Sequence, residues 1–438
     1  MPDVRLPKEP PLRSLFLDLN SYFASVEQAE DASLLGQPVA VVPLMADTTF
    51  CIAASYEAKA YGIKTGTRVD EARQRCPDLI LKVARPSLYV AYHDEIVRVL
   101  GNIIPVQRVA SIDEMEFGLM GSEQHPDRAR AIAQTMKETI WREISPAMNC
   151  SIGVAPNGFL AKIATELQKP NGLVILDAAA RETMLPTLAL TDWTGINRKM
   201  KARLNAAGIF SSADLLTAHR VMLRQAFGGI VGDRWYEWIR GAPQVEVKRP
   251  RQSLSHSNVL SPALRTDEGS YAILVRLTVK ALARLRSHNL LTQRVQLHVK
   301  GMEKSWEIER RIPATQSTPA VLKVINELWE RRDFARPLRV GVNLVDLVAP
   351  SEHTPSLFED AFLNPADDTV DQLNARFGRH KVFLASIAHT KERAQERIAF
   401  QKTELFQEGG TQEPWVNTRN AERMAEGEEA GSSNLAPQ

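Results

Sequence analysis

Strand-like and helix-like segments alternate over residues 12–176, and this alternation constrains the fold more than any other feature of the chain. The strand-like segments are short apolar runs, at 12–19, 38–43 and 150–155. Helical periodicity separates them, at 88–100 and 128–143. Such alternation predicts an α/β domain in which helices cover a sheet.

A second α/β pattern begins near residue 254, after a different kind of segment. Residues 177–241 read as short helices separated by glycines, and 242–253 read as a basic, proline-containing linker. The order beyond the linker is strand, helix, strand, strand, helix, strand, with the helices expected at 270–287 and 318–332. This order predicts one small domain with two helices on one sheet. At 438 residues the chain is too long for a single core, so we expect several domains.

Composition places the chain among ordinary globular proteins, with 44% hydrophobic and 24% charged residues. No run of about 18 apolar residues exists, so no membrane span is expected. The three cysteines, Cys51, Cys76 and Cys150, share no metal-ligand spacing. This usage predicts a reducing, cytoplasmic setting.

The net charge of +2 hides an uneven distribution. Residues 246–350 hold 18 Lys and Arg against 10 Asp and Glu, a balance of +8, and Arg286, Arg310 and Arg332 are among these cations. Residues 401–438 hold 3 against 7, a balance of −4. We therefore expect a polyanion-binding module followed by an acidic, disordered tail.

The stretch VASIDEMEFG places Asp113 and Glu114 side by side in a strand-like run. Neighbouring side chains on a regular strand point to opposite faces, so the pair predicts either a solvated turn or a strand end that brings both carboxylates together. Asp18, at the end of the 12–19 strand, could complete an oxygen-rich site for Mg²⁺. Spacing alone leaves both interpretations open.

Four segments resemble the Y-family DNA polymerases in order and spacing: DLNSYFASVEQ (18–28), ASYEAKAYGIKTG (54–66), SIDE (111–114) and FLAKIATELQKPNGL (159–173). The resemblance extends over about residues 12–350 and combines features of the UmuC and DinB branches. It implies a multi-domain α/β protein shaped as a right-hand polymerase. Such a fold has a palm of mixed sheet plus helices, small fingers, a helical thumb and an α/β little finger.

The resemblance also divides the chain into domains. We expect a palm at 12–21 and 86–176, fingers at 22–85, a helix–hairpin–helix-like thumb at 177–241, a linker at 242–253, a little finger at 254–350 and a partly disordered C-terminal extension at 351–438.

The resemblance implies a catalytic centre in which two Mg²⁺ ions are bound by Asp18, Asp113, Glu114 and the backbone carbonyl of Leu19. Phe23 aligns with the bulky residue that packs against the sugar of the incoming nucleotide and would collide with a 2′-hydroxyl.

Three further positions, Tyr56, Lys59 and Lys169, match those that hold the triphosphate, although many relatives carry Arg where Lys59 stands. Small residues at 53–55 are expected over the template base. In the segment after SIDE, Glu116 departs from the family pattern and is either a further carboxylate of the site or a solvated side chain.

The resemblance further implies contacts with primer–template DNA. Gly195 belongs to the hairpin of the thumb, where Asn197 replaces a second glycine. Basic residues of and next to the linker, Lys248, Arg249 and Arg251, are expected to contact phosphates. Leu357 and Phe358 resemble a sliding-clamp-binding peptide that lacks its leading Gln, and a chance hydrophobic pair explains them equally well.

The predicted function is therefore low-fidelity translesion synthesis by a DNA-directed DNA polymerase, using deoxynucleoside triphosphates. We expect a monomer in the cytoplasm, associated with the nucleoid. The alternative is a catalytically silent, ImuB-like scaffold in a mutagenesis complex, but such relatives lose the carboxylates that this chain keeps. A palm-domain cyclase shares the carboxylates but has no use for the basic module.

Overall fold

The computed structural model describes residues 9–244, 250–301, 304–332, 337–354, 365–377, 381–383 and 385. The chain divides into two compact units, and the boundary along the sequence falls between positions 247 and 248, inside the expected linker. Four predicted site residues lie outside the described residues, namely Lys248, Arg249, Leu357 and Phe358. The acidic tail at 401–438 also lies outside them.

The first unit is built on a five-stranded sheet with the order β5-β6-β1-β7-β8. At its centre, β1 (Ser14–Leu19) pairs antiparallel with β6 (Glu114–Gly118) and with β7 (Cys150–Ala155). The outer strands are β5 (Val106–Val109) and β8 (Leu173–Ile175). Every residue of β1 is buried, as expected for a strand covered on both faces.

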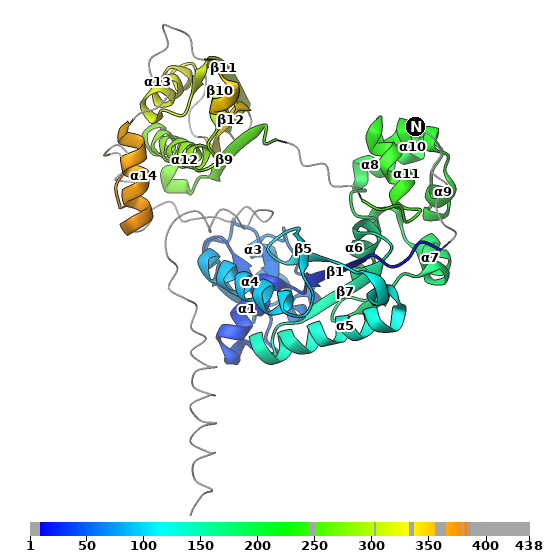
Figure 1. The fold of residues 1–438 in the computed structure, drawn as a ribbon. Helices are drawn as coiled ribbons and strands as arrows, with labels where there is room; N and C mark the ends of the chain where they lie inside the picture. Colours follow the sequence, from blue (N-terminus) through cyan, green and yellow to red (C-terminus); the bar gives the residue numbers. More distant parts are fainter. Residues whose placement is uncertain are drawn as a thin grey trace, which may run out of the picture. The chain divides into compact units, whose positions relative to one another are not determined.

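Helices cover both faces of this sheet, with α5 (Pro126–Thr139) and α6 (Gly158–Glu166) on opposite sides of β7 (Figure 1). A π-helical turn, Ile140–Ile144, follows α5, and α4 (Pro86–Gly101) packs on β5. A Cβ atom at Gly153 of β7 would lie 2.1 Å from the carbonyl oxygen of Ala161. Helix α6 can therefore approach the sheet this closely only because residue 153 is a glycine.

Residues 22–85 begin with α1 (Tyr22–Glu30) and form a small sheet of order β3-β2-β4. Its elements are β2 (Val39–Val42), β3 (Ala53–Ala54), α2 (Tyr56–Ala60), α3 (Val69–Arg75) and β4 (Ile80–Val83).

Ala53, Ala54 and Ser55 are no more than 9% exposed, because Ala53 and Ala54 form β3 and Ser55 caps α2. Their expected place over a template base remains a proposal. Ser21 holds the N-cap position of α1 but makes no capping bond, since its backbone is left-handed, with φ of 51°.

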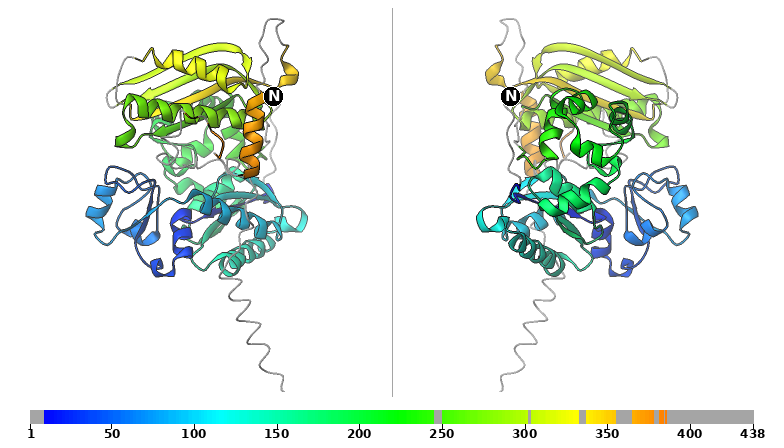
Figure 2. Two further views of the ribbon diagram at one scale, coloured as in Figure 1. Left: turned by 90° about the vertical axis from the view of Figure 1, so that its left-hand side faces the viewer. Right: turned by 90° about the vertical axis from the view of Figure 1, so that its right-hand side faces the viewer.

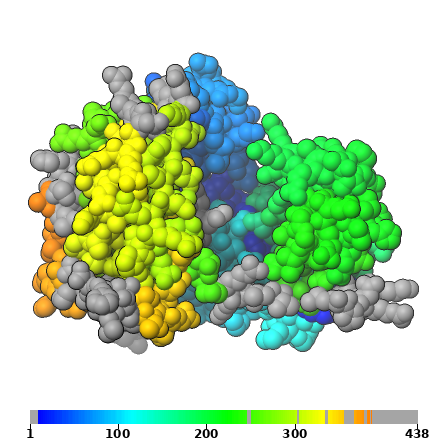
Figure 3. All heavy atoms as spheres, turned by 90° about the horizontal axis from the view of Figure 1, so that it is seen from above, coloured from blue at the N-terminus to red at the C-terminus, as the bar shows by residue number. Residues whose placement is uncertain are grey.

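Residues 178–241 form five short helices, α7 (Ala178–Met184), α8 (Arg198–Ala206), α9 (Ser212–Thr217), α10 (Arg220–Phe227) and α11 (Ile230–Trp238). Their aromatic core joins α6, because Phe159 packs edge-on against Trp235, with ring centroids 4.8 Å apart. In the space-filling view the blue residues of 22–85 and the green helices form separate lobes (Figure 3). The hollow between these lobes is floored by dark-blue and teal residues, the colours of the segments that hold β1 and β7.

The second unit contains a four-stranded sheet of order β11-β10-β12-β9, drawn in green to yellow in Figure 2. Its elements are β9 (Ser253–Val259), α12 (Asp267–Ser287), β10 (Leu291–Lys300), β11 (Ser305–Thr315), α13 (Thr318–Trp329) and β12 (Arg339–Val348). Both helices pack on the sheet and on each other. The predicted order of strands and helices is therefore correct. No helix in the described residues has the length and apolarity to cross a bilayer.

A further helix, α14 (Pro365–Phe377), is attached to this unit by ion pairs. The guanidinium of Arg286 contacts both carboxylate oxygens of Asp371, at 2.6 and 3.0 Å. Two other cations of the basic segment also have internal partners, Arg310 with Glu327 and Arg332 with Asp267. Glu327 and Asp267 are already counted in the +8 balance, so among these pairs only that of Arg286 with Asp371 of α14 reduces the net charge that is free for a polyanion.

Candidate active site

The three residues predicted to supply carboxylates lie where β1 ends beside the turn between β5 and β6. Asp18 and Glu114 are direct partners on neighbouring antiparallel strands, so their side chains share one face of the sheet. Asp113 precedes β6 in the turn, and its carbonyl accepts a hydrogen bond from the N–H of Leu19 at 2.8 Å. Because Asp113 lies in the turn and Glu114 begins the strand, their side chains do not follow the alternation between the two faces of a strand. Adjacent carboxylates can therefore lie on the same side of the sheet.

Two lysines of the α6 region neutralise this cluster. The ammonium of Lys169 lies 2.8 Å from Asp18 and 2.6 Å from Glu166, and that of Lys162 is bonded to Glu114. The sequence analysis missed Lys162 and Glu166, although they lie four residues apart on one face of α6, where side chains are neighbours.

Burial dominates the electrostatics of the cluster. It raises the pKa of Asp18 to about 7, although the neighbouring Lys169 acts in the opposite direction. Burial also raises the pKa of Asp113, against a 2.5 Å hydrogen bond from Ser111. For Lys169, burial lowers the pKa, but the carboxylates of Asp18 and Glu166 outweigh it and the net shift is upward. The site is thus a cluster of carboxylates that attracts cations.

The loop that carries Lys169 is held from two sides. The side-chain oxygen of Asn20 accepts a hydrogen bond from the N–H of Asn171 at 2.7 Å. From α5, the ammonium of Lys137 donates to the carbonyls of Cys150 at 2.6 Å and Asn171 at 2.9 Å. Asn20 therefore fixes the Lys-Pro-Asn-Gly loop and is not placed as a ligand of the cluster.

Tyr56 and Lys59 approach the same place from α2. The ammonium of Lys59 lies 4.2 Å from the centroid of the Tyr56 ring and donates to the Ser21 hydroxyl at 2.7 Å. Burial, together with the charge of Lys169, lowers the pKa of Lys59. Burial raises the pKa of Tyr56. The charge of Lys169 acts to lower this pKa, and the charge of Asp18 acts to raise it. All three predicted triphosphate contacts thus share one electrostatic environment with Asp18.

Phe23 is only 5% exposed and lies in the first turns of α1. Its ring stacks on that of Tyr89 of α4, with centroids 4.4 Å apart and planes 17° apart. The predicted contact with a nucleotide sugar and a role in the core are both compatible with this position.

Glu116 is neither a member of the carboxylate cluster nor solvated. Its side chain accepts hydrogen bonds from Ser14 at 2.9 Å and from two nitrogens of Arg108 at 2.7 and 3.0 Å. A Cβ atom at Gly158 would lie 2.0 Å from the Glu116 carboxylate, so α6 begins directly against it. Within the Met-Glu-Phe-Gly departure from the family pattern, Glu116 is therefore a buried carboxylate paired with the partly exposed Arg108.

Removing the partner of this buried carboxylate should reduce stability. We expect Arg108→Ala to lower the free energy of unfolding of the first unit by about 1–3 kcal/mol, because Arg108 is itself partly exposed. The matched control is Arg98→Ala, which removes the exposed Arg98–Glu95 pair and should cost less than about 1 kcal/mol. Chemical denaturation measures both, and equal losses would contradict the prediction.

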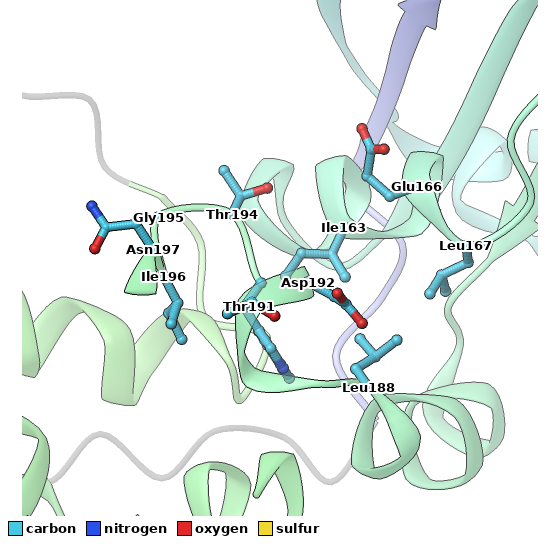
Figure 4. Close-up of a pocket in the computed structure, with 11 residues that line it drawn as sticks. Ile163, Glu166, Leu167, Leu188, Thr191, Asp192, Thr194, Gly195, Ile196 and Asn197 are labelled. Atoms are coloured by element: carbon cyan, nitrogen blue, oxygen red, sulfur yellow. The ribbon is translucent and has the colours of Figure 1, made fainter. Parts of the chain in front are cut away.

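A pocket of about 750 Å³ lies between the end of α6 and the turn that leads into α8 (Figure 4). Glu166 lines it from α6, and Gly195 and Asn197 line it from the turn. Gly195 has a φ of 97°, which explains the glycine there. Asn197 caps α8, since its side-chain oxygen accepts from the N–H of Met200 at 2.9 Å. The asparagine thus replaces glycine with a side chain that serves the helix end.

Arg251, the one predicted linker contact among the described residues, lies before β9, and its guanidinium is 2.5 Å from a ring nitrogen of His288. It belongs to the second unit, and Gly195 belongs to the first.

The donors at the carboxylate cluster are all oxygens, which suits a hard cation such as Mg²⁺. Within the described part of the chain, no three Asp, Glu, His or Cys side chains converge closely enough to hold a metal as they stand. Lysine ammonium groups contact Asp18 and Glu114 instead. The residues fit the ions in chemistry, and a bound metal would require Lys162 and Lys169 to give up these contacts.

Comparison with known proteins decides the family. The model of the impB/mucB/samB family matches residues 17–166, and that of the family's C-terminal domain matches 251–357. The DNA polymerase IV of Moorella thermoacetica is 31% identical over 85% of this chain and 95% of its own length. The chain belongs to the Y family of DNA polymerases. The prediction of a DNA-directed DNA polymerase is confirmed at the level of the family.

Other members of the Y family agree with this assignment. The DNA polymerase IV of Glaesserella parasuis is 27% identical over 75% of this chain and 94% of its own. In fold, a Y-family DNA polymerase chimera of Dbh and Dpo4 matches with a TM-score of 0.66 and 22% identity, over 77% of this chain and 99% of its own. An insertion ternary complex of Dbh DNA polymerase covers the same shares, with a TM-score of 0.52 and 23% identity. The predicted right-hand polymerase architecture is thereby confirmed.

Proposed function

We propose that this Y-family protein is a template-directed DNA polymerase that extends a primer with deoxynucleoside triphosphates and copies damaged templates with low fidelity. The observation that carries the proposal is the junction of β1 with the β5–β6 turn. There Asp18, Asp113 and Glu114 lie close to Lys169, which follows α6 and contacts Asp18. Short fingers, with helices of 5 and 7 residues, support a loose check of base-pair shape.

Asp18, Asp113, Glu114 and the carbonyl of Leu19 would hold two Mg²⁺ ions. When bound, such ions supply activation of the primer 3′-hydroxyl and charge stabilisation at the phosphates. The chain itself contributes the carboxylates of Asp18 and Asp113, whose raised pKa values reflect the cost of ionisation in a buried place. Lys162 and Lys169 balance these charges until substrate binds.

Tyr56, Lys59 and Lys169 would bind the triphosphate, supplying a hydroxyl and two ammonium groups from opposite sides. We expect Lys169→Met to raise the KM for deoxynucleotides by about tenfold or more, with a smaller loss in kcat, because one charge-assisted contact is removed. Lys64→Met, at an exposed lysine of the fingers, is the control and should leave KM unchanged. Steady-state single-nucleotide insertion measures both, and an unchanged KM in Lys169→Met would refute this role.

Binding of primer–template DNA would use the open face of the second unit. Lys300 and Arg339 are direct partners on β10 and β12, and both are exposed. Like charges opposite one another on a sheet repel, and a phosphate between them would relieve the repulsion. Gly195, in the thumb hairpin, and the pocket that it lines would contact DNA phosphates. Lys248, Arg249 and Arg251 remain proposed phosphate contacts.

The domain boundaries expected from the sequence are proposed for this chain as they stand, with the palm at 12–21 and 86–176, the fingers at 22–85, the thumb at 177–241 and the little finger at 254–350. Clamp binding through Leu357 and Phe358, a monomeric state and association with the nucleoid also remain proposals.

Primer extension tests the proposed function directly. The full chain is mixed with a primer–template duplex, Mg²⁺ and four deoxynucleotides, and the template base is varied. Extension that follows the template would support the proposal. Binding of duplex without extension would favour the scaffold alternative, and a cyclic-nucleotide product would favour a cyclase.

A further inference from the structure

Phe23 has an aromatic support behind it that no sequence motif indicates. The ring of Tyr89 lies 4.4 Å from that of Phe23 and is nearly parallel to it. Tyr89 is completely buried, in the first turn of α4, so it has little space in which to move. A phenylalanine stacked on such a partner cannot retreat unless the partner also moves.

Tyr89 is itself anchored at its far end. Its hydroxyl donates to the Glu27 carboxylate at 2.7 Å, and the side chain of Glu27 is 2% exposed. Two nitrogens of Arg85 donate to the same carboxylate at 3.1 and 2.6 Å. Burial raises the pKa of Tyr89, and the bond to Glu27 acts in the same direction, so the hydroxyl remains a donor. A buried, charge-assisted bond of this kind holds both partners in one geometry.

The spacing of these contacts makes the support continuous. Phe23 and Glu27 are four residues apart and therefore lie on one face of α1, one turn from each other. Tyr89 spans that turn, with its ring on Phe23 and its hydroxyl on Glu27. The hydroxyl of Tyr22 donates to the Tyr89 carbonyl at 2.5 Å and attaches the backbone of α4 to α1.

We propose that Tyr89 is a positioning residue for sugar selection, which holds the Phe23 ring rigidly in the place where a 2′-hydroxyl would need room. The inference rests on the proposed role of Phe23 and extends it to a group that touches no substrate. Discrimination against ribonucleotides requires that the Phe23 ring does not move when a 2′-hydroxyl approaches it. The hydrogen bonds that join Tyr89, Glu27 and Arg85 supply this rigidity. Loss of the support lets Phe23 shift while the carboxylate cluster keeps its place.

The test compares kcat/KM for a deoxynucleotide and its ribonucleotide in single-nucleotide insertion. Tyr89→Leu removes the stacked ring, and Tyr89→Phe keeps the ring but removes the bond to Glu27. Tyr92→Phe is the matched control, because Tyr92 lies one turn along α4 and its hydroxyl donates to Glu30 at 2.7 Å. Phe23→Ala gives the ratio expected when the Phe23 ring is absent. The double variant Phe23→Ala/Tyr89→Leu completes a double-mutant cycle.

We expect discrimination to fall about tenfold in Tyr89→Leu and severalfold in Tyr89→Phe, through a gain with the ribonucleotide and nearly unchanged insertion of the deoxynucleotide. The double variant should discriminate no worse than Phe23→Ala, and Tyr92→Phe should match wild type. Equal losses with both nucleotides, or an unchanged ratio in both Tyr89 variants, would overturn the proposal. If Tyr89→Leu does not fold, Tyr89→Phe decides. An unchanged ratio in Phe23→Ala would instead refute the role of Phe23 itself, while polymerisation could still stand.

Discussion

Primer extension is expected to fall by at least about a thousandfold when Asp113 is replaced by asparagine. The substitution keeps the shape of the side chain and its contact with Ser111, but removes the charge that a divalent ion requires. Stability should not fall with activity. Burial raises the pKa of the Asp113 carboxyl, so ionisation at neutral pH costs folding free energy, and the neutral amide avoids that cost. Extension assays and thermal unfolding, run on the same preparations, check both parts.

The matched control for this experiment is Glu116→Gln. Glu116 is a buried carboxylate three residues further along the chain, but Arg108 and Ser14 occupy its oxygens. We expect this variant to lose stability and to retain extension once it is folded. Extension that persists in Asp113→Asn, or that disappears equally in both variants, would remove the basis for a metal role at Asp113.

Ribonucleotide insertion is expected to rise on the order of a hundredfold relative to deoxynucleotide insertion in Phe23→Ala. The alanine opens the space that a 2′-hydroxyl needs, and the deoxynucleotide loses only a packing contact. The measurement is the ratio of kcat/KM for the two sugars with the same base and template. Deoxynucleotide insertion should remain detectable, because the carboxylates and Lys169 are untouched.

A partly buried phenylalanine in another domain provides the control. Phe227 of the thumb stacks on Trp235, with ring centroids 4.3 Å apart, in a geometry close to that of Phe23 on Tyr89. Phe227→Ala should weaken the thumb without changing the sugar ratio. A rise in the ratio in both variants would mean that general loosening admits ribonucleotides, and Phe23 would lose its assigned role.

Periodicity in the sequence determined most of the architecture. Strands near 12–19 and 150–155 and the helix near 88–100 occur within a few residues of their expected bounds, because each buries a regular apolar pattern. The two helices of the second unit also lie within a few residues of their expected bounds, and its four strands follow the expected order. Motif order predicted the family. The structure places Asp18 and Glu114 opposite each other on β1 and β6, with Asp113 in the adjoining turn, and their metal role remains a proposal.

Only the tertiary structure decided how the charged and aromatic side chains pair. The sequence left Glu116 as either a further carboxylate of the site or a solvated side chain, whereas the structure pairs it with Arg108 of β5. Arg286 counted among the cations of the basic segment, whereas the structure pairs it with Asp371 of α14. The burial of Ala53 and Ala54 in the small sheet likewise follows from tertiary contacts. Local periodicity reports which face of an element is apolar, but the partner of a polar group is set by contacts between residues far apart in the chain, and no local pattern encodes those contacts.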